Sequence, residues 1–133
     1  MKIGSFDTDE SYNLIFILGA SGSGKTVLAN NLVKAYPRSF DKFVQYTTRP
    51  MREGERQNID YHFVSKDVME EDVMKRDSMI AVVRKQFDNV YGTDLAESKD
   101  GKYGIVVVSI EGFVDALEKM RELSKQGIDF YAD

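Results

Sequence analysis

The chain has 133 residues, a formal net charge of −4 and no cysteine, so it fits one domain with a single core and can form neither disulfides nor thiolate metal sites. A cytoplasmic setting is expected, because nothing argues for an oxidising compartment and residues 1–7 are too polar for a secretory signal. We expect no nucleic-acid partner and no membrane partner, since the charge provides no broad positive field and no apolar run approaches the ~18 residues of a membrane span.

The first predicted elements are a strand, a glycine-rich loop and a helix in direct succession. The apolar run 14–18 predicts a strand, and the helical spacing of apolar residues over 27–36 predicts a helix. The loop between them consists of Gly19, Ala20, Ser21, Gly22, Ser23, Gly24, Lys25 and Thr26. This pattern in this setting is typical of a phosphate-binding loop, although a glycine-rich turn that matches by accident is the alternative.

The chemistry of this loop predicts nucleoside triphosphate binding. Its glycines allow the backbone to turn N–H groups toward a polyphosphate, and the following helix presents its N-terminus to the same anion. The ammonium group of Lys25 suits the β- and γ-oxygens. The hydroxyl of Thr26 is placed to coordinate Mg²⁺, which makes Mg²⁺ the expected cofactor.

The middle of the chain predicts short strands and helices around one polar segment. Expected strands are 43–46, 61–64 and 79–83, and expected helices are 65–77, capped by Ser65, and a short one started by Asp94 and Glu97. Residues 47–58 are polar, rich in arginine and without periodicity. We interpret them as an ordered excursion from the sheet.

The last predicted elements complete an α/β fold. The run 105–110 is continuous and β-branched, which predicts a strand buried on both faces beside the strand of the glycine loop. A helix over 111–126, ended by Gly127, and a strand over 128–131 follow. The alternation of strands and helices predicts a parallel sheet covered by helices.

Two arginines in the polar segment suggest a second anion site. Arg49 and Arg52 stand three residues apart around Pro50, so their planar guanidinium groups are placed to converge on one phosphate. A solvated loop whose charges only balance explains the same residues equally well. Arg84 and Lys85 are expected to form a solvated edge.

Three motifs, in order, resemble the guanylate kinase family. They are the glycine loop 19–26, the Thr-Thr-Arg-x-x-Arg-x-Gly-Glu pattern of 47–55 with Tyr-x-Phe at 61–63, and Tyr-Gly-Thr at 91–93. The resemblance runs from residue 14 to the end of the chain. It implies one domain over 1–133: a P-loop NTPase-type parallel sheet with flanking helices, formed by 1–42 and 92–133, and an inserted monophosphate-binding subdomain, 43–91.

The resemblance also implies an activity and roles for single residues. ATP on the glycine loop would donate its γ-phosphoryl group to a nucleoside monophosphate, with GMP favoured. Arg49 and Arg52 would hold the acceptor phosphate, Tyr61 and Tyr91 would donate hydrogen bonds to it, and Thr93 would lie near the base. No protein nucleophile is needed, because Lys25, Mg²⁺ and the arginines stabilise the transferring charge.

Several positions depart from the family pattern. Gln45 and Tyr46 stand before Thr-Thr-Arg, where the family has a small Ser. Ala81 stands where a Glu reads the guanine edge, and Val107 and Ser109 stand at an Asp-x-Asp pair. The lid, final strand and final helix of the family are also expected to be absent. Two alternatives to the kinase therefore stay open: a nucleotide-binding or protein-interaction module that lost transfer, and the N-terminal portion of a longer kinase.

Overall fold

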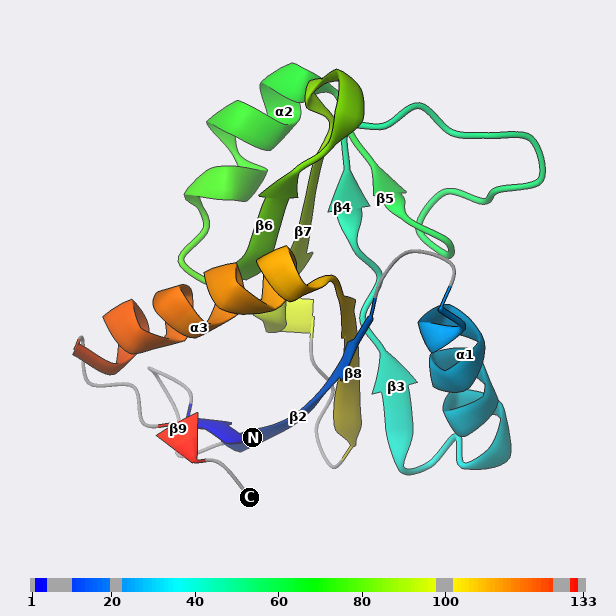
Figure 1. The fold of residues 1–133 in the computed structure, drawn as a ribbon, viewed down its shortest axis with the longest axis vertical. Coiled ribbons are helices and arrows are strands. Elements are labelled where there is room, and N and C mark those ends of the chain that lie inside the picture. The colour runs from blue at the N-terminus through cyan, green and yellow to red at the C-terminus, as the bar shows by residue number, and fades with distance from the viewer. Residues whose placement is uncertain (1, 5–10, 20–22, 98–101, 126–129, 132–133) are drawn as a thin grey trace.

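The computed structural model describes residues 2–4, 11–19, 23–97, 102–125 and 130–131, which form two sheets and their helices (Figure 1). The larger sheet has the strand order β3-β8-β2-β1-β9. Its members are β1 (Lys2–Gly4), β2 (Ser11–Leu18), β3 (Phe40–Lys42), β8 (Tyr103–Val108) and β9 (Phe130–Tyr131).

The centre of the larger sheet is parallel. β2 pairs with β8 along its length, with Leu18 opposite Val108, and β3 pairs with the other edge of β8. The predicted placement of the buried strand beside the strand of the glycine loop is therefore confirmed, although this strand ends at Val108. β1 is antiparallel to both β2 and β9, so the sheet is mixed at that side. A three-residue strand such as β1 is too short to give a sequence signal.

The smaller sheet has the order β5-β4-β7-β6. Its strands are β4 (Tyr46–Thr47), β5 (His62–Phe63), β6 (Met79–Arg84) and β7 (Val90–Asp94). The predicted strand over 43–46 is wrong, because residues 43–45 carry the chain from one sheet to the other. The apolar signal there comes from Phe43, which is buried in the core next to β8.

The helices lie around and between the sheets. They are α1 (Lys25–Ala35), α2 (Lys66–Glu71), α3 (Ile110–Lys125) and the 3₁₀ helices η1 (Val73–Lys75), η2 (Gln86–Asp88) and η3 (Leu95–Glu97). The predicted caps are confirmed: the Ser65 hydroxyl accepts from the Val68 amide, and the Asp94 carboxylate accepts from the Ala96 amide. The helix predicted over 65–77 is divided into α2 and η1. None of the helices in these ranges is both long and apolar enough to cross a membrane.

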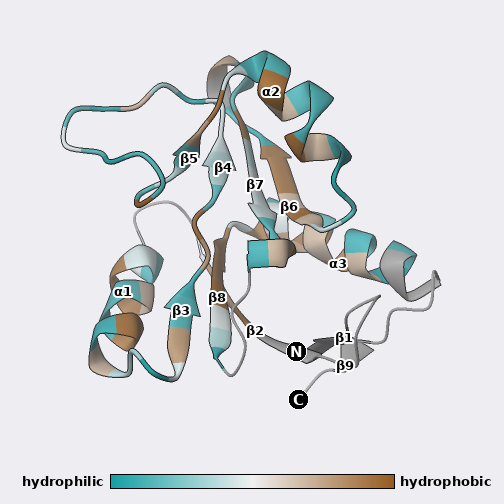
Figure 2. Cartoon of the chain, turned by 180° about the vertical axis from the view of Figure 1, so that it is seen from behind, coloured by the Kyte–Doolittle hydropathy of each residue, from teal (hydrophilic) through white to brown (hydrophobic). Residues whose placement is uncertain are grey.

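A shared hydrophobic core joins the two sheets through α3. It combines residues of β2, β6, β8, η3 and α3 with one residue of the segment 43–45: Leu14, Phe43, Ile80, Ala81, Leu95, Val106, Val108, Ala116 and Met120. A second cluster lies between α2, η1 and the smaller sheet: Met69, Val73, Met79 and Val90. Figure 2 shows hydrophobic residues along β6 and most of β8, and a largely hydrophilic segment between β4 and β5. The shared core fixes the position of one sheet relative to the other.

Candidate active site

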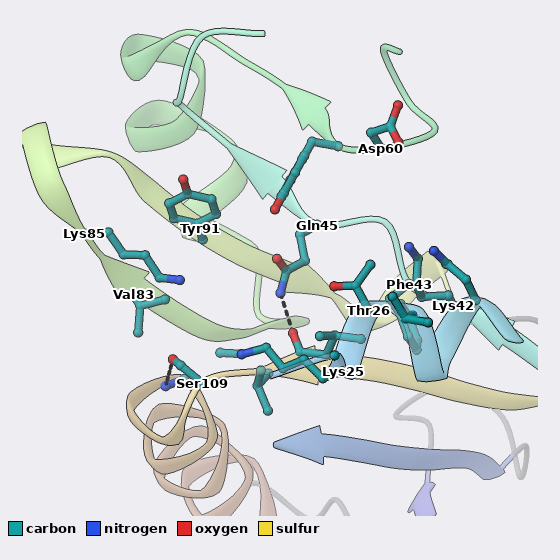
Figure 3. A pocket seen from close by; sticks show the side chains of 18 of the residues that line it. Lys25, Thr26, Lys42, Phe43, Gln45, Asp60, Val83, Lys85, Tyr91 and Ser109 are labelled. Atoms are coloured by element: carbon teal, nitrogen blue, oxygen red, sulfur yellow. Dashed lines mark hydrogen bonds between the residues drawn. The ribbon is translucent and has the colours of Figure 1, made fainter. Parts of the chain in front are cut away.

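A cleft of about 580 Å³ lies where the two sheets meet (Figure 3). It is at the carboxyl ends of β2 and β8, where open α/β sheets bind ligands. Its walls come from the start of α1, the end of β8, residues 43–45 between the two sheets, the hairpin β6–β7 and the segment before β5. The lining residues are Gly24, Lys25, Thr26, Val27, Asn30, Lys42, Phe43, Gln45, Glu55, Asp60, Tyr61, Ala81, Val83, Lys85, Tyr91, Val107, Val108, Ser109 and Gly112.

The glycine loop contributes its last three residues to this cleft. Gly24 has a φ of 89°, a left-handed conformation that glycine adopts without strain, and α1 begins directly after it. The ammonium group of Lys25 donates a hydrogen bond to the Gly19 carbonyl, and Thr26 is exposed at the cleft. The Gly19 amide donates to the Val108 carbonyl at 3.3 Å, which ties the loop to β8.

Gly19 and Ser23 are the other loop residues that the structure describes. Gly19 approaches the next turn so closely that a Cβ placed on it would come within 2.5 Å of the Ser23 hydroxyl oxygen. Neither residue is among those that line the cleft. Ala20, Ser21 and Gly22 lie outside the described residues.

Burial lowers the pKa of Lys25, and the positive charge of Lys85 lowers it further. Lys85 follows β6 directly, and its ammonium group lies 5.0 Å from the centre of the Tyr91 ring. The expected solvated edge is thus only partly right: Lys85 is exposed, but it lines the cleft. The sequence does not predict that Lys85 lines the cleft. Lys85 comes just after β6, where the alternation of side chains along a strand no longer indicates which way a side chain points.

Arg49 is held by Glu55. Its guanidinium group donates to the two carboxylate oxygens at 2.9 and 2.8 Å and to the Pro50 carbonyl at 3.1 Å. The side chain is 9% exposed and lies over the rings of Tyr61 and Phe63 at 5.1 and 5.7 Å. The hydrogen bonds to Glu55 raise the pKa of Arg49, and the Tyr91 hydroxyl adds to this. The same bonds, with one from the Arg52 amide, lower the pKa of Glu55 to about 2.

Arg49 and Arg52 meet at one carboxylate, that of Glu55, which stands three residues after Arg52. The Arg52 amide donates to this carboxylate at 2.7 Å, while the Arg52 side chain is exposed. Neither arginine is among the described residues that line the cleft, whereas Glu55 is. The convergence of the two guanidinium groups on one anion stays a prediction. In the sequence, the pairing of Arg49 with Glu55 is indicated only by the Glu that ends the 47–55 motif.

The structure brings two of the three remaining predicted residues to the cleft. Tyr61 and Tyr91 line it, with ring centres 6.0 Å apart in an edge-to-face arrangement. Thr93 lies in β7 and is completely buried, and its hydroxyl has no hydrogen-bond partner within the described part of the chain. Thr93 does not reach the cleft wall.

The positions that depart from the family pattern gather in one wall. Gln45, Ala81, Val107 and Ser109 all line the cleft, and the Gln45 amide donates to the Val107 carbonyl at 2.9 Å (Figure 3). Ala81 has a φ of 56° at an irregularity in the pairing of β6 with β7. These four side chains offer an amide, two apolar groups and a hydroxyl, so this wall carries no charge.

The donor set of the cleft fits a metal ion that brings most of its own ligands. Thr26 offers a hydroxyl at the start of α1. Over the described ranges, no group of three or more His, Asp or Glu side chains is arranged to hold a metal. Mg²⁺ bound to phosphates keeps several waters and takes few protein ligands, so a single hydroxyl is compatible with it.

Comparisons with known proteins give a consistent result. A family model described as guanylate kinase matches residues 11–126. The chain is 36% identical over 120 residues to the guanylate kinase of Chlamydia trachomatis serovar D, covering 86% of this chain and 57% of that protein. It is 35% identical over 111 residues to the guanylate kinase of Lactiplantibacillus plantarum, with coverages of 80% and 53%. A crystal structure of guanylate kinase from Anaplasma phagocytophilum has a TM-score of 0.62 and 26% identity, over 85% of this chain and 57% of that one.

The matched region contains all three motifs of the sequence: the glycine loop, the 47–63 segment and Tyr-Gly-Thr at 91–93. The chain spans a little over half the length of these relatives. Its fold, an α/β structure with a parallel sheet core and flanking helices, agrees with the same assignment. The chain therefore belongs to the guanylate kinase family.

Proposed function

We propose that this protein transfers the γ-phosphoryl group of ATP to a nucleoside monophosphate, with GMP as the favoured acceptor. One observation supports the proposal most strongly: a single cleft has Lys25 and Thr26 on one side and Tyr61 and Tyr91 on the other. The first pair belongs to the glycine loop. Of the second pair, Tyr61 directly precedes β5 and Tyr91 lies in β7. The relatives are named guanylate kinases, which favours GMP.

The triphosphate would be bound by residues 19–26. Lys25 now donates to the Gly19 carbonyl, and in the complex it would donate to the phosphate oxygens. Thr26 would hold Mg²⁺, which supplies charge neutralisation of the phosphoryl oxygens when bound. This assigns ATP and Mg²⁺ to the wall formed by the start of α1.

The acceptor phosphate would be bound from the opposite wall by Arg49, Arg52, Tyr61 and Tyr91. Arg49 has five N–H donors, and within the described residues Glu55 and Pro50 accept from three of them, so the guanidinium group keeps donor capacity for a phosphate that Tyr91 also contacts. We assign Glu55 a positioning role, because it fixes the plane of the guanidinium group. Arg52 would have to turn toward the cleft.

The base would lie against the uncharged wall of Gln45, Ala81, Val107 and Ser109, with Thr93 behind it. A site without a charged acceptor discriminates weakly between bases by hydrogen bonding. We therefore expect several monophosphates to be accepted, GMP among them. In this arrangement the smaller sheet forms the monophosphate-binding subdomain, residues 43–91, on a core of 1–42 and 92–133. The cytoplasmic location stays a prediction.

The proposal is tested by binding and turnover in parallel. ATP, GMP, dGMP, AMP and UMP are titrated by calorimetry, and ADP release is then followed with each acceptor. Arg49→Ala is compared with Arg38→Ala, which removes the same charge from an exposed position outside the cleft.

Turnover with a monophosphate, together with acceptor binding that Arg49→Ala reduces at least tenfold and Arg38→Ala leaves unchanged, supports the kinase. ATP binding without binding of any acceptor contradicts it and leaves a nucleotide-binding module. Acceptor binding that does not depend on Arg49 retires the proposed acceptor site.

A further inference from the structure

Two lysines from different parts of the fold enter the cleft from facing walls. Lys25 comes from the start of α1, and Lys85 comes from the turn between β6 and β7. Both line the same cleft, and Figure 3 shows the end of the Lys85 side chain pointing toward the part of the cleft that Lys25 and Ser109 also border.

The position of Lys85 is supported by its surroundings. Its backbone amide donates to the Asn89 carbonyl at 2.8 Å, which closes the turn, and its ammonium group lies 5.0 Å from the centre of the Tyr91 ring. A cation over an aromatic face is held by the ring quadrupole. Over the described ranges, no ion pair joins Lys85 to a carboxylate.

Two ammonium groups that border one cleft repel each other when no anion lies between them. An anion placed between the two groups turns the repulsion into two attractions. The cleft is large enough for such a ligand, and its neighbouring wall of Gln45, Ala81, Val107 and Ser109 offers no competing charge.

We propose that Lys85 is an anion-binding residue of this cleft and contacts a phosphoryl group held between it and Lys25. This rests on the proposed function for the identity of the ligand, a nucleotide, but the contact itself requires only phosphoryl oxygens. The group is either the phosphate of the acceptor or the γ-phosphoryl of ATP, and both present the same oxygens to Lys85.

The test uses the full chain and four variants. Lys85→Gln removes the charge at nearly constant length, and Lys85→Arg keeps it. Arg84→Gln is the matched control, since it removes a charge from the neighbouring exposed residue, which does not line the cleft. Lys25→Gln is the positive control for the facing wall. Inorganic diphosphate, ATP, ADP and GMP are titrated by calorimetry, and circular dichroism checks that each variant is folded.

We expect Lys85→Gln to weaken diphosphate binding about tenfold, Lys85→Arg to restore most of it, and Arg84→Gln to change it less than twofold. A larger loss for GMP than for ATP assigns Lys85 to the acceptor phosphate. A larger loss for ATP than for ADP assigns it to the γ-phosphoryl group. Unchanged affinity for diphosphate, ATP and GMP in folded Lys85→Gln overturns the proposal.

The diphosphate titration is a readout that does not depend on any nucleotide activity. Absence of turnover with every acceptor would retire the kinase while diphosphate binding still decides the role of Lys85.

Discussion

The guanidinium group of Arg49 and the carboxylate of Glu55 form two parallel hydrogen bonds at the edge of the cleft, at 2.9 and 2.8 Å. The two residues are six positions apart in the chain, and the Arg52 amide donates to the same carboxylate at 2.7 Å. Bidentate pairs fix the plane of the arginine as well as its position. Glu55 therefore organises the whole arginine-rich segment.

The first prediction concerns the pH dependence of stability. The pKa of Glu55 is lowered from 4.5 to about 2 by Arg49 and the Arg52 amide. A carboxylate with a lowered pKa stabilises the fold above its unfolded value, and the stabilisation is lost as the pH falls through the folded value. We expect the free energy of unfolding to fall between pH 4.5 and pH 2, and Glu55→Gln to flatten the curve in this window. Urea unfolding of both chains measures it, and parallel curves would refute the role given to Glu55.

The second prediction concerns the triphosphate wall. Lys25→Ala removes the ammonium group that we assign to the phosphates, so ATP affinity should fall about tenfold or more. Lys34→Ala, on an exposed position of the same helix, should leave ATP affinity unchanged. Calorimetry measures both affinities, and thermal unfolding should show little difference between the variants. Equal ATP affinity in the two variants would mean that the glycine loop is not the triphosphate site.

The third prediction concerns Thr93, whose completely buried hydroxyl has no partner within the described ranges. Thr93→Val removes the unsatisfied group at constant volume, so the free energy of unfolding should rise by about 1 kcal/mol. Thr47→Val is the control, because Thr47 is equally buried but its hydroxyl accepts from the Arg49 amide at 3.1 Å. Chemical denaturation should show a gain for the first variant and a loss for the second. A loss for Thr93→Val would show that its hydroxyl has a partner.

The fourth prediction concerns the link between α3 and the smaller sheet. The Asp115 carboxylate accepts from the Val82 amide at 2.6 Å, next to the irregular backbone at Ala81. Asp115→Ala leaves this amide unsatisfied and should reduce the free energy of unfolding by about 1–2 kcal/mol. Asp115→Asn keeps an acceptor and should lose less, and Glu118→Ala, an exposed change on α3, should be close to neutral. Equal stability of all three variants would exclude Asp115 as a support of β6.

Local structure was predictable where the type of one residue restricts the backbone conformation or caps a helix. Gly24 at a positive φ, the Ser65 cap of α2 and the Asp94 cap of η3 are each explained by a residue and its next few neighbours. The run of β-branched residues before Ser109 also predicted the central strand. Two predictions failed because contacts with distant parts of the chain decided the structure: the helix over 65–77 is divided, and 43–46 is not a strand. There the burial of Val73 and Phe43 against distant elements decided the backbone path.

The sequence by itself determined the glycine loop, the α/β class, the membership in a family and the residue types of the two segments that we propose to bind phosphate groups. These follow from spacing and from the chemistry of single side chains. Only the tertiary structure decided that Lys85 faces Lys25, that Glu55 occupies the Arg49 fork and that Gln45, Ala81, Val107 and Ser109 share one wall. The physical reason is that α3 and its core hold the two sheets together, so residues far apart in the chain meet at one cleft.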